Sequence, residues 1–318
     1  MSLTTAKDFF SSLGVSPVTG RKKVEQEHIP FFKRGNKVDY FTNVMDIISM
    51  RGEIKKCEEG SIIVFGNNKG GVGKTTVASN IGATLSHYGY NVLLVDWDIQ
   101  SNLTFNFGKS VKTHNIINVV LGQEKLQDCI FSYLHDRVFG KLDILGNDFS
   151  MVDEYNDIEG DKLAFLEGLK KEYDFILIDT PPTIYTKLES ALLCADYFVA
   201  VLKPDSFSQD GVVKFMKSFD KVKIKNQQLK VLGGIISIKN NRSSNDLSYS
   251  ETITKNFMDI TDSEIIGSIS SSSVINEIIG GGAMVFQNYK HNVAMQIYTT
   301  TNQLVESYIV DLYKQGKL

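Results

Sequence analysis

The sequence predicts an α/β fold with a mainly parallel sheet that helices cover on both faces. Short apolar runs alternate with stretches of helical periodicity, a glycine-rich segment joins one run to a helix, and two aspartates directly follow apolar runs. Parallel strands that are buried on both faces read as continuous apolar runs, and their carboxyl ends carry the ligand sites of open α/β sheets. One edge of the sheet is therefore the expected functional edge.

Six apolar runs are the predicted strands of this sheet. Each is short, rich in aliphatic residues and separated from the next by helix-like sequence. They cover residues 61–65, 92–95, 142–145, 175–178, 197–202 and 231–238. After the first run, Val77, Ile81 and Leu85 recur at helical spacing. Gly89 ends the helix that this spacing predicts.

The beginning of the chain has a different texture. A short helix is predicted over Thr4–Leu13, and a second helix starts at Ser16 and Pro17. Serine is a good N-cap, and proline suits the first helical position. Residues 31–41 are predicted to form a hairpin that turns at Gly35–Asn36. The order helix, turn, helix and wing is the natural summary.

An apolar stripe marks the segment that follows the hairpin. Its members are Val44, Ile47, Ile48 and Ile54. Such a stripe is typical of a helix that packs on one face, so the segment is a linker helix or a dimer contact. We place a domain boundary at Gly60, with a small amino-terminal region at 1–60 and the α/β domain at 61–318.

Composition excludes several classes of protein. The formal net charge of −3 gives no overall attraction to polyanions, so any nucleic-acid contact must be local. The first ten residues lack the pattern of an export signal, and no apolar run reaches the roughly 18 residues of a membrane span. We expect a cytoplasmic protein. Its three cysteines lie far apart, which disfavours an iron–sulfur site.

The glycine-rich segment has the form of a phosphate-binding loop. It reads Lys69, Gly70, Gly71, Val72, Gly73, Lys74, Thr75, Thr76, and it lies between a predicted strand and a predicted helix. Glycines let backbone N–H groups turn towards phosphate oxygens, and the helix N-terminus adds a favourable field. Lys74 is expected to reach the β- and γ-phosphates, and the Thr75 hydroxyl to ligate Mg²⁺.

The loop departs from the common pattern at its start. Asn68 stands where a first glycine is usual, and a second lysine, Lys69, follows it. The segment resembles the deviant Walker A motif of the ParA and MinD superfamily of P-loop NTPases. The resemblance implies ATP and Mg²⁺ as cofactors. It also implies that Lys69 crosses a dimer interface to contact the nucleotide of the partner subunit.

Two further segments agree with this resemblance. The first runs from Asp96 to Asn102 and is similar to the family's first switch, D-x-D-x-Q-x-N, in which Asp96 would position or polarise the attacking water. The second ends in Asp179-Thr180-Pro181-Pro182 and resembles Walker B with the DTPP ending of ParA proteins. There, Asp179 would hold Mg²⁺ through water. The expected catalytic residues are Lys69, Lys74 and Asp96.

The resemblance covers about residues 61–318. In relatives, the backbone at the position of Pro204 and Asp205 holds adenine, so these two residues are expected to bind the cofactor. Ser237 stands where relatives often carry Asn or Thr, and a side-chain contact with the base is not expected from it.

The resemblance also implies a function. In the family, ATP closes a sandwich dimer that binds DNA without sequence preference, and a ParB-like centromere-binding partner stimulates a weak ATPase to release it. We therefore expect a nucleoid-associated protein that partitions a plasmid or a chromosome. Larger plasmid partition ATPases carry an amino-terminal extension that represses their own operon, which makes operator DNA a further expected partner.

Residues 5–41 resemble winged helix-turn-helix modules of the MerR and excisionase kind. The recognition helix would carry Arg21, Lys22 and Lys23, and the wing would carry Lys33, Arg34 and Lys37. Residues 1–40 hold seven Lys or Arg against four Asp or Glu, which suits phosphate contact. A docking domain without a role in DNA binding remains open. Other basic candidates, or simply solvated positions, are Lys214, Lys217, Lys221, Lys223, Lys225, Lys239, Arg242 and Lys290.

Two other functions remain open. A MinD-like ATPase that positions cargo on a membrane shares the three motifs but needs a basic amphipathic carboxyl-terminal helix. Here the final segment has an apolar stripe at Leu304, Tyr308 and Leu312, with Glu306 and Asp311 near it. It is expected to pack on the core, without stable membrane association. The second alternative is a transcription regulator in which nucleotide is only a structural ligand.

Overall fold

The computed structural model describes most of the chain. The described residues are 3–27, 29, 31–34, 36–41, 44–109, 111–134, 139–182, 186–205, 208–241, 243–273, 275 and 292–318.

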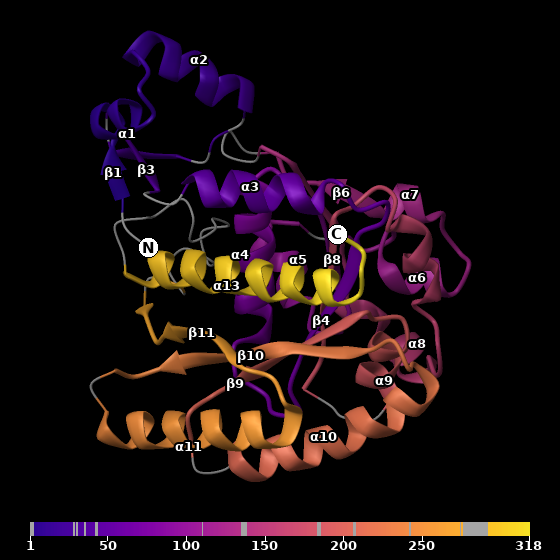
Figure 1. The fold of residues 1–318 in the computed structure, drawn as a ribbon. Helices are drawn as coiled ribbons and strands as arrows, with labels where there is room; N and C mark the ends of the chain where they lie inside the picture. Colours follow the sequence, from indigo (N-terminus) through magenta and orange to yellow (C-terminus); the bar gives the residue numbers. More distant parts are fainter. Residues whose placement is uncertain are drawn as a thin grey trace.

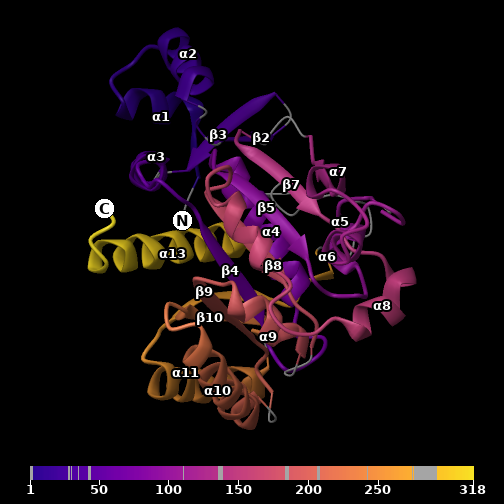
Figure 2. The same cartoon turned by 90° about the vertical axis from the view of Figure 1, so that its right-hand side faces the viewer.

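An eight-stranded sheet forms the centre of the molecule (Figures 1 and 2). Its strands are β4 (Ser61–Gly66), β5 (Asn91–Asp96), β6 (Ile130–Ser132), β7 (Lys141–Leu145), β8 (Phe175–Asp179), β9 (Tyr197–Leu202), β10 (Lys230–Lys239) and β11 (Ile265–Ser270). Their order is β11-β10-β9-β4-β8-β5-β7-β6, and all neighbours are parallel except β6 and β7. All six predicted strands are confirmed. The two strands that were not predicted, β6 and β11, lie at the two edges of the sheet.

Helices cover both faces of the sheet, as predicted. One face carries α4 (Lys74–His87) and α13 (Asn292–Lys314), and the other carries α9 (Thr186–Leu193), α10 (Ser208–Lys225) and α11 (Ser244–Thr261). Short helices fill the connections. They are α5 (Asn102–Asn106), α6 (Ile116–Val120), α7 (Leu126–Cys129), η1 (Phe149–Met151), α8 (Val152–Asp157) and η2 (Ala164–Leu169).

Strand β4 is apolar at each position from Ile62 to Phe65. Ile62 and Val64 belong to the core that contains α9, α10 and α11, whereas Ile63 and Phe65 belong to the core that contains α4 and α13. All four side chains are fully buried. Alternate residues of a strand point to opposite faces, so a strand covered on both sides needs apolar residues throughout.

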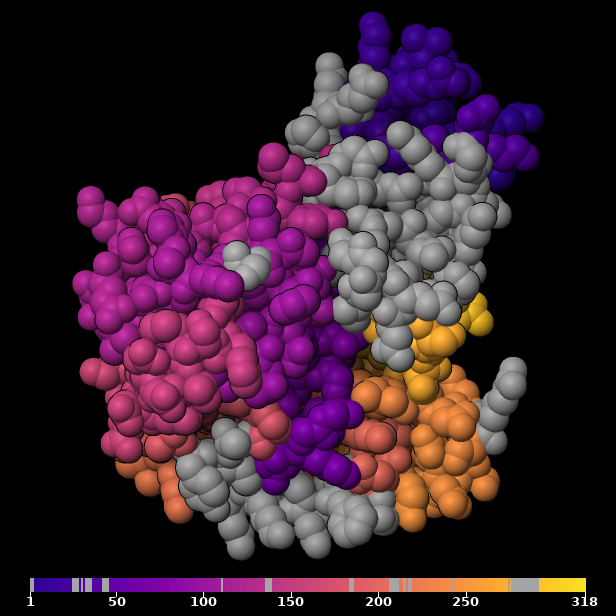
Figure 3. Space-filling view, turned by 180° about the vertical axis from the view of Figure 1, so that it is seen from behind, coloured from indigo at the N-terminus to yellow at the C-terminus, as the bar shows by residue number. Residues whose placement is uncertain are grey.

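The first residues form a small unit at one end of the molecule, indigo at the top of Figure 3, and Figure 1 shows helices α10 and α11 at the opposite end. Its elements are β1 (Leu3–Thr5), α1 (Ala6–Ser12), α2 (Pro17–Glu27), β2 (Phe31–Arg34), β3 (Lys37–Phe41) and α3 (Val44–Ile54). The strands form an antiparallel sheet in the order β1-β3-β2. The predicted hairpin and the second helix starting at Pro17 are confirmed.

The first helix begins later than predicted. Thr4 and Thr5 pair with β3 as a strand, and the Thr5 hydroxyl then accepts a hydrogen bond from the Asp8 N–H as the N-cap of α1. A threonine at this point satisfies an N–H group that has no partner within the helix. Helix α1 therefore starts at Ala6.

Gly20 in α2 has a packing role. A Cβ atom at this position would lie 2.4 Å from the ring of Phe10, which is buried in α1. Only glycine allows the two helices to approach this closely. The cost of a glycine inside a helix, about 1 kcal/mol, is thereby offset by the contact with the aromatic ring.

The amino-terminal unit contacts the α/β domain through aromatic and polar side chains. Phe41 lies edge-on to Tyr298 of α13 at a ring distance of 4.8 Å and to Tyr88 at 6.2 Å. The Arg51 guanidinium of α3 donates to the main-chain carbonyl of Tyr88 at 3.1 Å. Tyr88 follows the last residue of α4, so the unit touches the far end of the helix that starts at the glycine-rich loop. The predicted boundary at Gly60 coincides with the start of β4.

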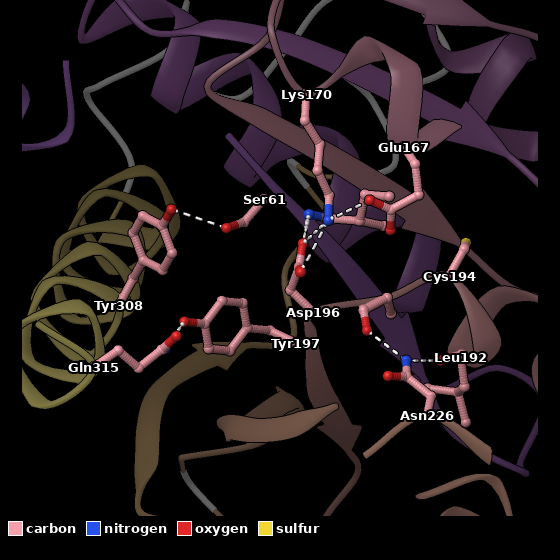
Figure 4. Close-up of polar contacts among 12 residues, drawn as sticks. Ser61, Glu167, Lys170, Leu192, Cys194, Asp196, Tyr197, Asn226, Tyr308 and Gln315 are labelled. Atoms are coloured by element: carbon pink, nitrogen blue, oxygen red, sulfur yellow. Dashed lines mark hydrogen bonds and ion pairs between the residues drawn. The ribbon is translucent and has the colours of Figure 1, made fainter. Parts of the chain in front are cut away.

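The carboxyl-terminal helix α13 packs on the core and forms hydrogen bonds with it. Its stripe of Leu304, Tyr308 and Leu312 is buried, which confirms the predicted packing. The hydroxyl groups of Tyr308 and Ser61 are 2.9 Å apart (Figure 4). Further along, Asp311 accepts hydrogen bonds from Tyr197 at 2.8 Å and from Lys230 at 2.9 Å. The apolar face of this helix is thus occupied by the sheet. None of the described helices has the length and apolar character needed to cross a membrane.

A second polar cluster, also visible in Figure 4, lies at the amino-terminal edge of the sheet. The Lys170 ammonium is nearly buried and pairs with Glu167 at 2.8 Å and with Asp196 at 2.9 Å. Asp196 also accepts the Ile62 N–H at 2.8 Å. Removing one partner of such a buried pair leaves an uncompensated charge, so this cluster stabilises the edge opposite the glycine-rich loop.

Candidate functional site

The three predicted motifs meet at the carboxyl edge of the sheet. Asp96 ends β5, Asp179 ends β8, and the two residues are partners in the strand register. Strand β4 leads into the glycine-rich loop. It pairs with β8 on the side opposite to β5. Consecutive parallel strands thus bring the loop and both aspartates to one place, as the sequence predicts.

The loop has the backbone conformation that glycine permits. Gly71 and Gly73 have φ angles of +67° and +84°, in the left-handed region that disfavours residues with a Cβ atom. Gly73 is the N-cap of α4. Opposite the loop, a Cβ atom at Gly70 would lie 3.8 Å from Pro182 of the predicted second switch. The first turn of α4 is therefore free to offer N–H groups to an anion.

Lys74 is a buried cation at the start of α4. Only 6% of the residue is exposed, and its Nζ atom donates to the main-chain carbonyl of Lys69 at 3.3 Å. Burial lowers the pKa of Lys74, whereas the negative charges of Asp179 and Asp98 act in the opposite direction. The ammonium therefore lies between the loop and the two carboxylates, where the tail of a nucleotide is expected.

Lys69 has a different ionic partner from Lys74. Its ammonium pairs with the carboxylate of Asp205, and more than a third of its side chain is exposed. The Lys69 N–H donates to the Asn67 side chain at 3.0 Å, which fixes the backbone while the side chain points outward. The structure thus gives the Asp205 carboxylate a lysine partner in the loop, and the adenine contact expected from the backbone of Pro204 and Asp205 stays a prediction.

Asp179 has the environment of a cation ligand. Its carboxylate is fully buried, and neither oxygen has a hydrogen-bond partner of good geometry among the described residues. Burial and the charge of Asp96 raise the pKa of Asp179, and the nearby Thr75 hydroxyl and Lys74 partly offset this effect. A buried carboxylate without donors is costly unless a cation balances it.

The surroundings of Asp179 fit Mg²⁺ held jointly with phosphate. The described residues contain no group of three or more His, Cys, Asp or Glu side chains placed as a metal site. Mg²⁺ usually takes one or two protein ligands, with water and substrate phosphates as the rest. The Thr75 hydroxyl and the Asp179 carboxylate satisfy that requirement.

The carboxylate of Asp96 is already occupied by the protein. Its Oδ2 atom accepts from the N–H and the hydroxyl of Thr104, at 2.8 and 2.6 Å, and its Oδ1 atom accepts the Asp98 N–H at 3.3 Å. Burial raises the pKa of Asp96 to about 7, although the Thr104 hydrogen bonds act in the opposite direction. This arrangement holds the predicted first switch against α5.

Asp98 is the functional candidate that sequence reasoning did not assign. It is nearly buried, and its charge acts on both Lys74 and Asp179. Its Oδ1 atom accepts the Gln100 N–H at 3.0 Å, while Oδ2 has no hydrogen bond within the described part of the chain. The D-x-D motif contains two aspartates, and this was the available signal for a second candidate. Two residues that follow a strand can have different environments, so Asp98 can have a role that Asp96 does not have.

A hollow of about 170 Å³ opens beside the loop. It is lined by Gly73, Thr76, Val77, Ser237, Ile238, Ile269, Ser270, Ser271, Ser272 and Ile275. The Ser237 hydroxyl donates to the main-chain carbonyl of Val72, so it supports the loop. The hollow lies at the ends of β10 and β11, next to the glycine-rich loop.

Ile238 has strained backbone at the rim of this hollow. Its φ angle is +55°, which is rare for a β-branched residue. The register between β10 and β11 passes from Ile236 opposite Ser268 to Lys239 opposite Ser270, so β10 carries one extra residue. Such a bulge redirects side chains near functional sites. The sequence Gly-Gly-Ile-Ile-Ser-Ile gave no signal of it.

The predicted DNA-binding residues are spread over the amino-terminal unit. Arg21 and Lys22 are exposed on α2, Lys23 is half-buried there, and Lys37 is exposed on β3. Helix α2 is the outermost element of that unit (Figure 1). The side chains of Lys33 and Arg34 lie outside the described part of the structure. So do Arg242, Lys290 and the side chains of Lys214 and Lys217.

On α10, Lys221, Lys223 and Lys225 are exposed near the end of the helix. The Lys225 ammonium pairs with Glu189 at 2.7 Å. Lys239 is half-buried at the end of β10. The geometry therefore does not gather the described basic residues into one patch within a single copy of the chain.

The α/β domain is similar to known proteins in sequence and in structure. The model of the AAA domain family AAA_31 matches residues 60–231. A ParA family protein of Mycoplasma genitalium is 31% identical over 192 residues, which cover 54% of this chain and 69% of the relative. A virulence plasmid ParA family protein of Chlamydia psittaci is 29% identical and covers 68% of this chain and 81% of its own.

Among solved structures, the septum site-determining protein MinD of Pyrococcus horikoshii, complexed with Mg-ADP, matches with a TM-score of 0.64 and 27% identity. The match covers 81% of this chain and 99% of that one. The family model leaves residues 1–59 outside its match.

Proposed function

The chain belongs to the ParA family of P-loop ATPases, and on that premise we propose that it is a DNA partition protein whose ATP-bound dimer binds DNA without sequence preference. It is an ATPase that uses ATP and Mg²⁺ and acts in partition or positioning. The finer cycle is our proposal: ATP closes the dimer, the dimer binds DNA, and a ParB-like partner stimulates hydrolysis and release.

The observation that carries this proposal is the position of Lys69. Lys74 already faces the carboxylates of its own site, whereas Lys69 leaves the same loop in another direction and pairs with Asp205 near the surface. A partly exposed pair of this kind contributes little stability, so it exchanges readily for a stronger anion. The triphosphate of a second subunit is such an anion, and the exchange favours the dimer only when ATP is present.

In this proposal the residues of the site have separate roles in binding and hydrolysing ATP. The loop N–H groups and Lys74 would bind the phosphates, which places the γ-phosphate in the buried part of the site. Thr75 and Asp179 would hold Mg²⁺, whose charge neutralises the phosphate oxygens. Lys69 of a second subunit would add positive charge where it develops during phosphoryl transfer.

We assign the water-orienting role to Asp98 in preference to Asp96. Asp98 has an oxygen without a hydrogen bond to the described residues and lies within electrostatic reach of Lys74 and Asp179. Asp96 uses both oxygens to hold Thr104 and the Asp98 N–H. Its role is therefore to position the segment that carries Asp98.

The amino-terminal unit is a proposed second DNA contact. The order of α1, α2 and the β2–β3 hairpin is that of a helix-turn-helix with a wing, and the exposed Arg21 and Lys22 lie on its outer helix. Such a unit suits operator DNA and repression of the chain's own operon. Its contact with the end of α4, through Arg51 and Tyr88, connects it to the helix that begins at the phosphate loop.

A membrane-positioning role, as in MinD, receives no support from the carboxyl-terminal helix α13. The apolar stripe of α13 is buried against the sheet, so it is not available to a lipid bilayer in this conformation. Sedimentation with anionic liposomes, with and without ATP, tests this alternative: the proposal predicts that the protein stays in the supernatant in both cases.

Replacing Lys69 by alanine tests the dimer. We expect Lys69→Ala to bind ATP within about threefold of the wild-type affinity, because the Lys69 ammonium pairs with Asp205 whereas Lys74 is the lysine that faces the carboxylates of its own site. Its ATP-dependent dimerisation should weaken on the order of 100-fold, which is the loss expected from one or two charge-assisted hydrogen bonds. Sedimentation velocity with a slowly hydrolysed ATP analogue measures the fractions of monomer and dimer.

The matched control is Lys55→Ala. Lys55 is also a partly exposed lysine with one carboxylate partner, Asp174, but it lies at the opposite edge of the sheet. This variant should dimerise normally. Normal dimerisation of Lys69→Ala would remove the observation on which the proposed function rests.

A further inference from the structure

Trp97 joins the two predicted switches. It lies between Asp96 and Asp98 and is completely buried. Its indole N–H donates to the main-chain carbonyl of Lys187 at 2.9 Å. Lys187 is the second residue of α9, the helix that follows the Pro181–Pro182 segment. One side chain therefore connects the D-x-D segment directly to the helix beyond the second switch.

Tyr155 of α8 closes this connection from a third side. Its hydroxyl donates to the main-chain carbonyl of Trp97 at 2.8 Å, and the two rings lie edge-on at 5.5 Å. A buried tyrosine hydroxyl needs a partner, and here that partner is the backbone of the first switch. The negative charges of Asp98 and Asp96 help to raise the pKa of Tyr155, behind the larger effect of burial, so the hydroxyl lies close to both carboxylates.

Lys187 completes a closed ring of contacts. Its ammonium is nearly buried and donates to the carbonyls of Tyr155 and Ile158 at the end of α8. It also lies 4.5 Å from the centre of the Tyr155 ring. A buried cation is costly, and the carbonyl dipoles at a helix C-terminus offset that cost. Trp97 binds Lys187, Lys187 binds Tyr155, and Tyr155 binds Trp97.

The backbone of Trp97 adds a link to the Mg²⁺ ligand. Its N–H donates to the main-chain carbonyl of Asp179 at 3.0 Å, directly after the last register pair of β5 and β8. The next residue along the chain is Asp98. Any shift of the ring therefore changes the position of Asp98 relative to Asp179.

We propose that the ring of Trp97, Tyr155 and Lys187 positions Asp98 for ATP hydrolysis and couples the first switch to α9. This inference rests on the role proposed above for Asp98. The three residues do not touch the reacting atoms in this account. They hold the carboxylate in place from behind, as positioning residues, so that movement of α9 or α8 changes the rate of hydrolysis.

Tyr155→Phe is the smallest change that tests the contacts among Trp97, Tyr155 and Lys187. It removes the hydroxyl contact with the Trp97 carbonyl and keeps the aromatic ring. We expect kcat for ATP hydrolysis to fall about tenfold, with KM for ATP within twofold of wild type, because a small displacement of a catalytic group affects the reaction more than binding.

The matched control is Tyr308→Phe. Tyr308 is an equally buried tyrosine whose hydroxyl has one side-chain partner, Ser61, at the opposite edge of the sheet. The two variants lose comparable hydroxyl contacts, so their melting temperatures should fall by similar amounts. Only Tyr155→Phe should lose kcat.

Trp97 is the only tryptophan of the chain, so its fluorescence reports directly on the contacts among Trp97, Tyr155 and Lys187. Wild type and Tyr308→Phe should show the same emission change when a slowly hydrolysed ATP analogue and Mg²⁺ are added. Tyr155→Phe should show less than half of that change. Lys187→Met, which removes the ammonium at similar length, should reproduce both effects.

The inference is overturned if Tyr155→Phe and Tyr308→Phe share the wild-type kcat and emission change. It is also overturned if Tyr155→Phe raises KM alone, because the ring would then act on ATP binding. Failure of the role proposed for Asp98 is distinguishable, since Asp98→Ala would then hydrolyse ATP as fast as wild type.

Discussion

Lys74→Ala should bind ATP at least 100-fold more weakly than wild type. The Lys74 ammonium is the buried cation that faces Asp98 and Asp179, and it is held in the loop by the Lys69 carbonyl. Two charge-assisted hydrogen bonds to phosphate, at roughly 1.5–3 kcal/mol each, account for a loss of this size. Titration with a fluorescent ATP analogue in the presence of Mg²⁺ measures it.

The control for this variant is Lys170→Ala. Lys170 is a similarly buried lysine, but its partners are Glu167 and Asp196 at the far edge of the sheet (Figure 4). Its loss should lower the melting temperature and leave the affinity for ATP within about twofold. If Lys74→Ala and Lys170→Ala weakened binding equally, the effect would come from instability of the fold.

Asp98→Ala should bind ATP and Mg²⁺ nearly as wild type does but hydrolyse ATP on the order of 100-fold more slowly. Removing one group that is aimed at the reacting atoms typically costs this much in kcat. The variant should accumulate as the ATP-bound dimer. Single-turnover hydrolysis, started by mixing a preformed ATP complex with Mg²⁺, separates the chemical step from binding.

Asp143→Ala is the control for loss of a buried carboxylate. Asp143 is as buried as Asp98, but it pairs with Lys141, Ser132 and Tyr173 in β7 and its neighbourhood. It should lower stability without a specific loss of kcat. Rapid turnover by Asp98→Ala together with a dead Asp96→Ala would return the water-orienting role to Asp96, as the sequence alone suggested.

The site could be predicted from the sequence where chain order and sheet topology coincide. The glycine-rich loop, Asp96 and Asp179 each follow an apolar strand, and parallel strands place their carboxyl ends at one edge. The same reasoning predicted the six inner strands. It missed β6, which has three residues, and β11, which is rich in serine and glycine and only partly buried.

Contacts between residues far apart in the chain could not be predicted. Asp205 pairs with Lys69 across 136 positions, and the indole N–H of Trp97 reaches Lys187 across 90. No periodicity or spacing carries such information, because it depends on how packed helices approach one another. The bulge at Ile238 is a similar case, since its strained backbone is imposed by β11 and the loop.

The amino-terminal unit has some features that the sequence predicts and others that it does not. Its helix starting at Pro17 and its hairpin follow from turn chemistry, which is local. Its attachment to the end of α4 depends on Phe41 and Arg51 meeting Tyr88, which only the tertiary structure reveals. The role of the unit in binding operator DNA stays a prediction.

The most direct test of the whole account is DNA binding by the full chain in three nucleotide states across a range of salt concentrations. With ADP or without nucleotide, binding to random-sequence DNA should be weak. With a slowly hydrolysed ATP analogue and Mg²⁺, it should tighten by a factor of ten or more and weaken steeply as salt rises, because dimerisation brings basic side chains together and phosphate contacts release counterions. Equal affinity in all three states would contradict an ATP-switched DNA partition protein.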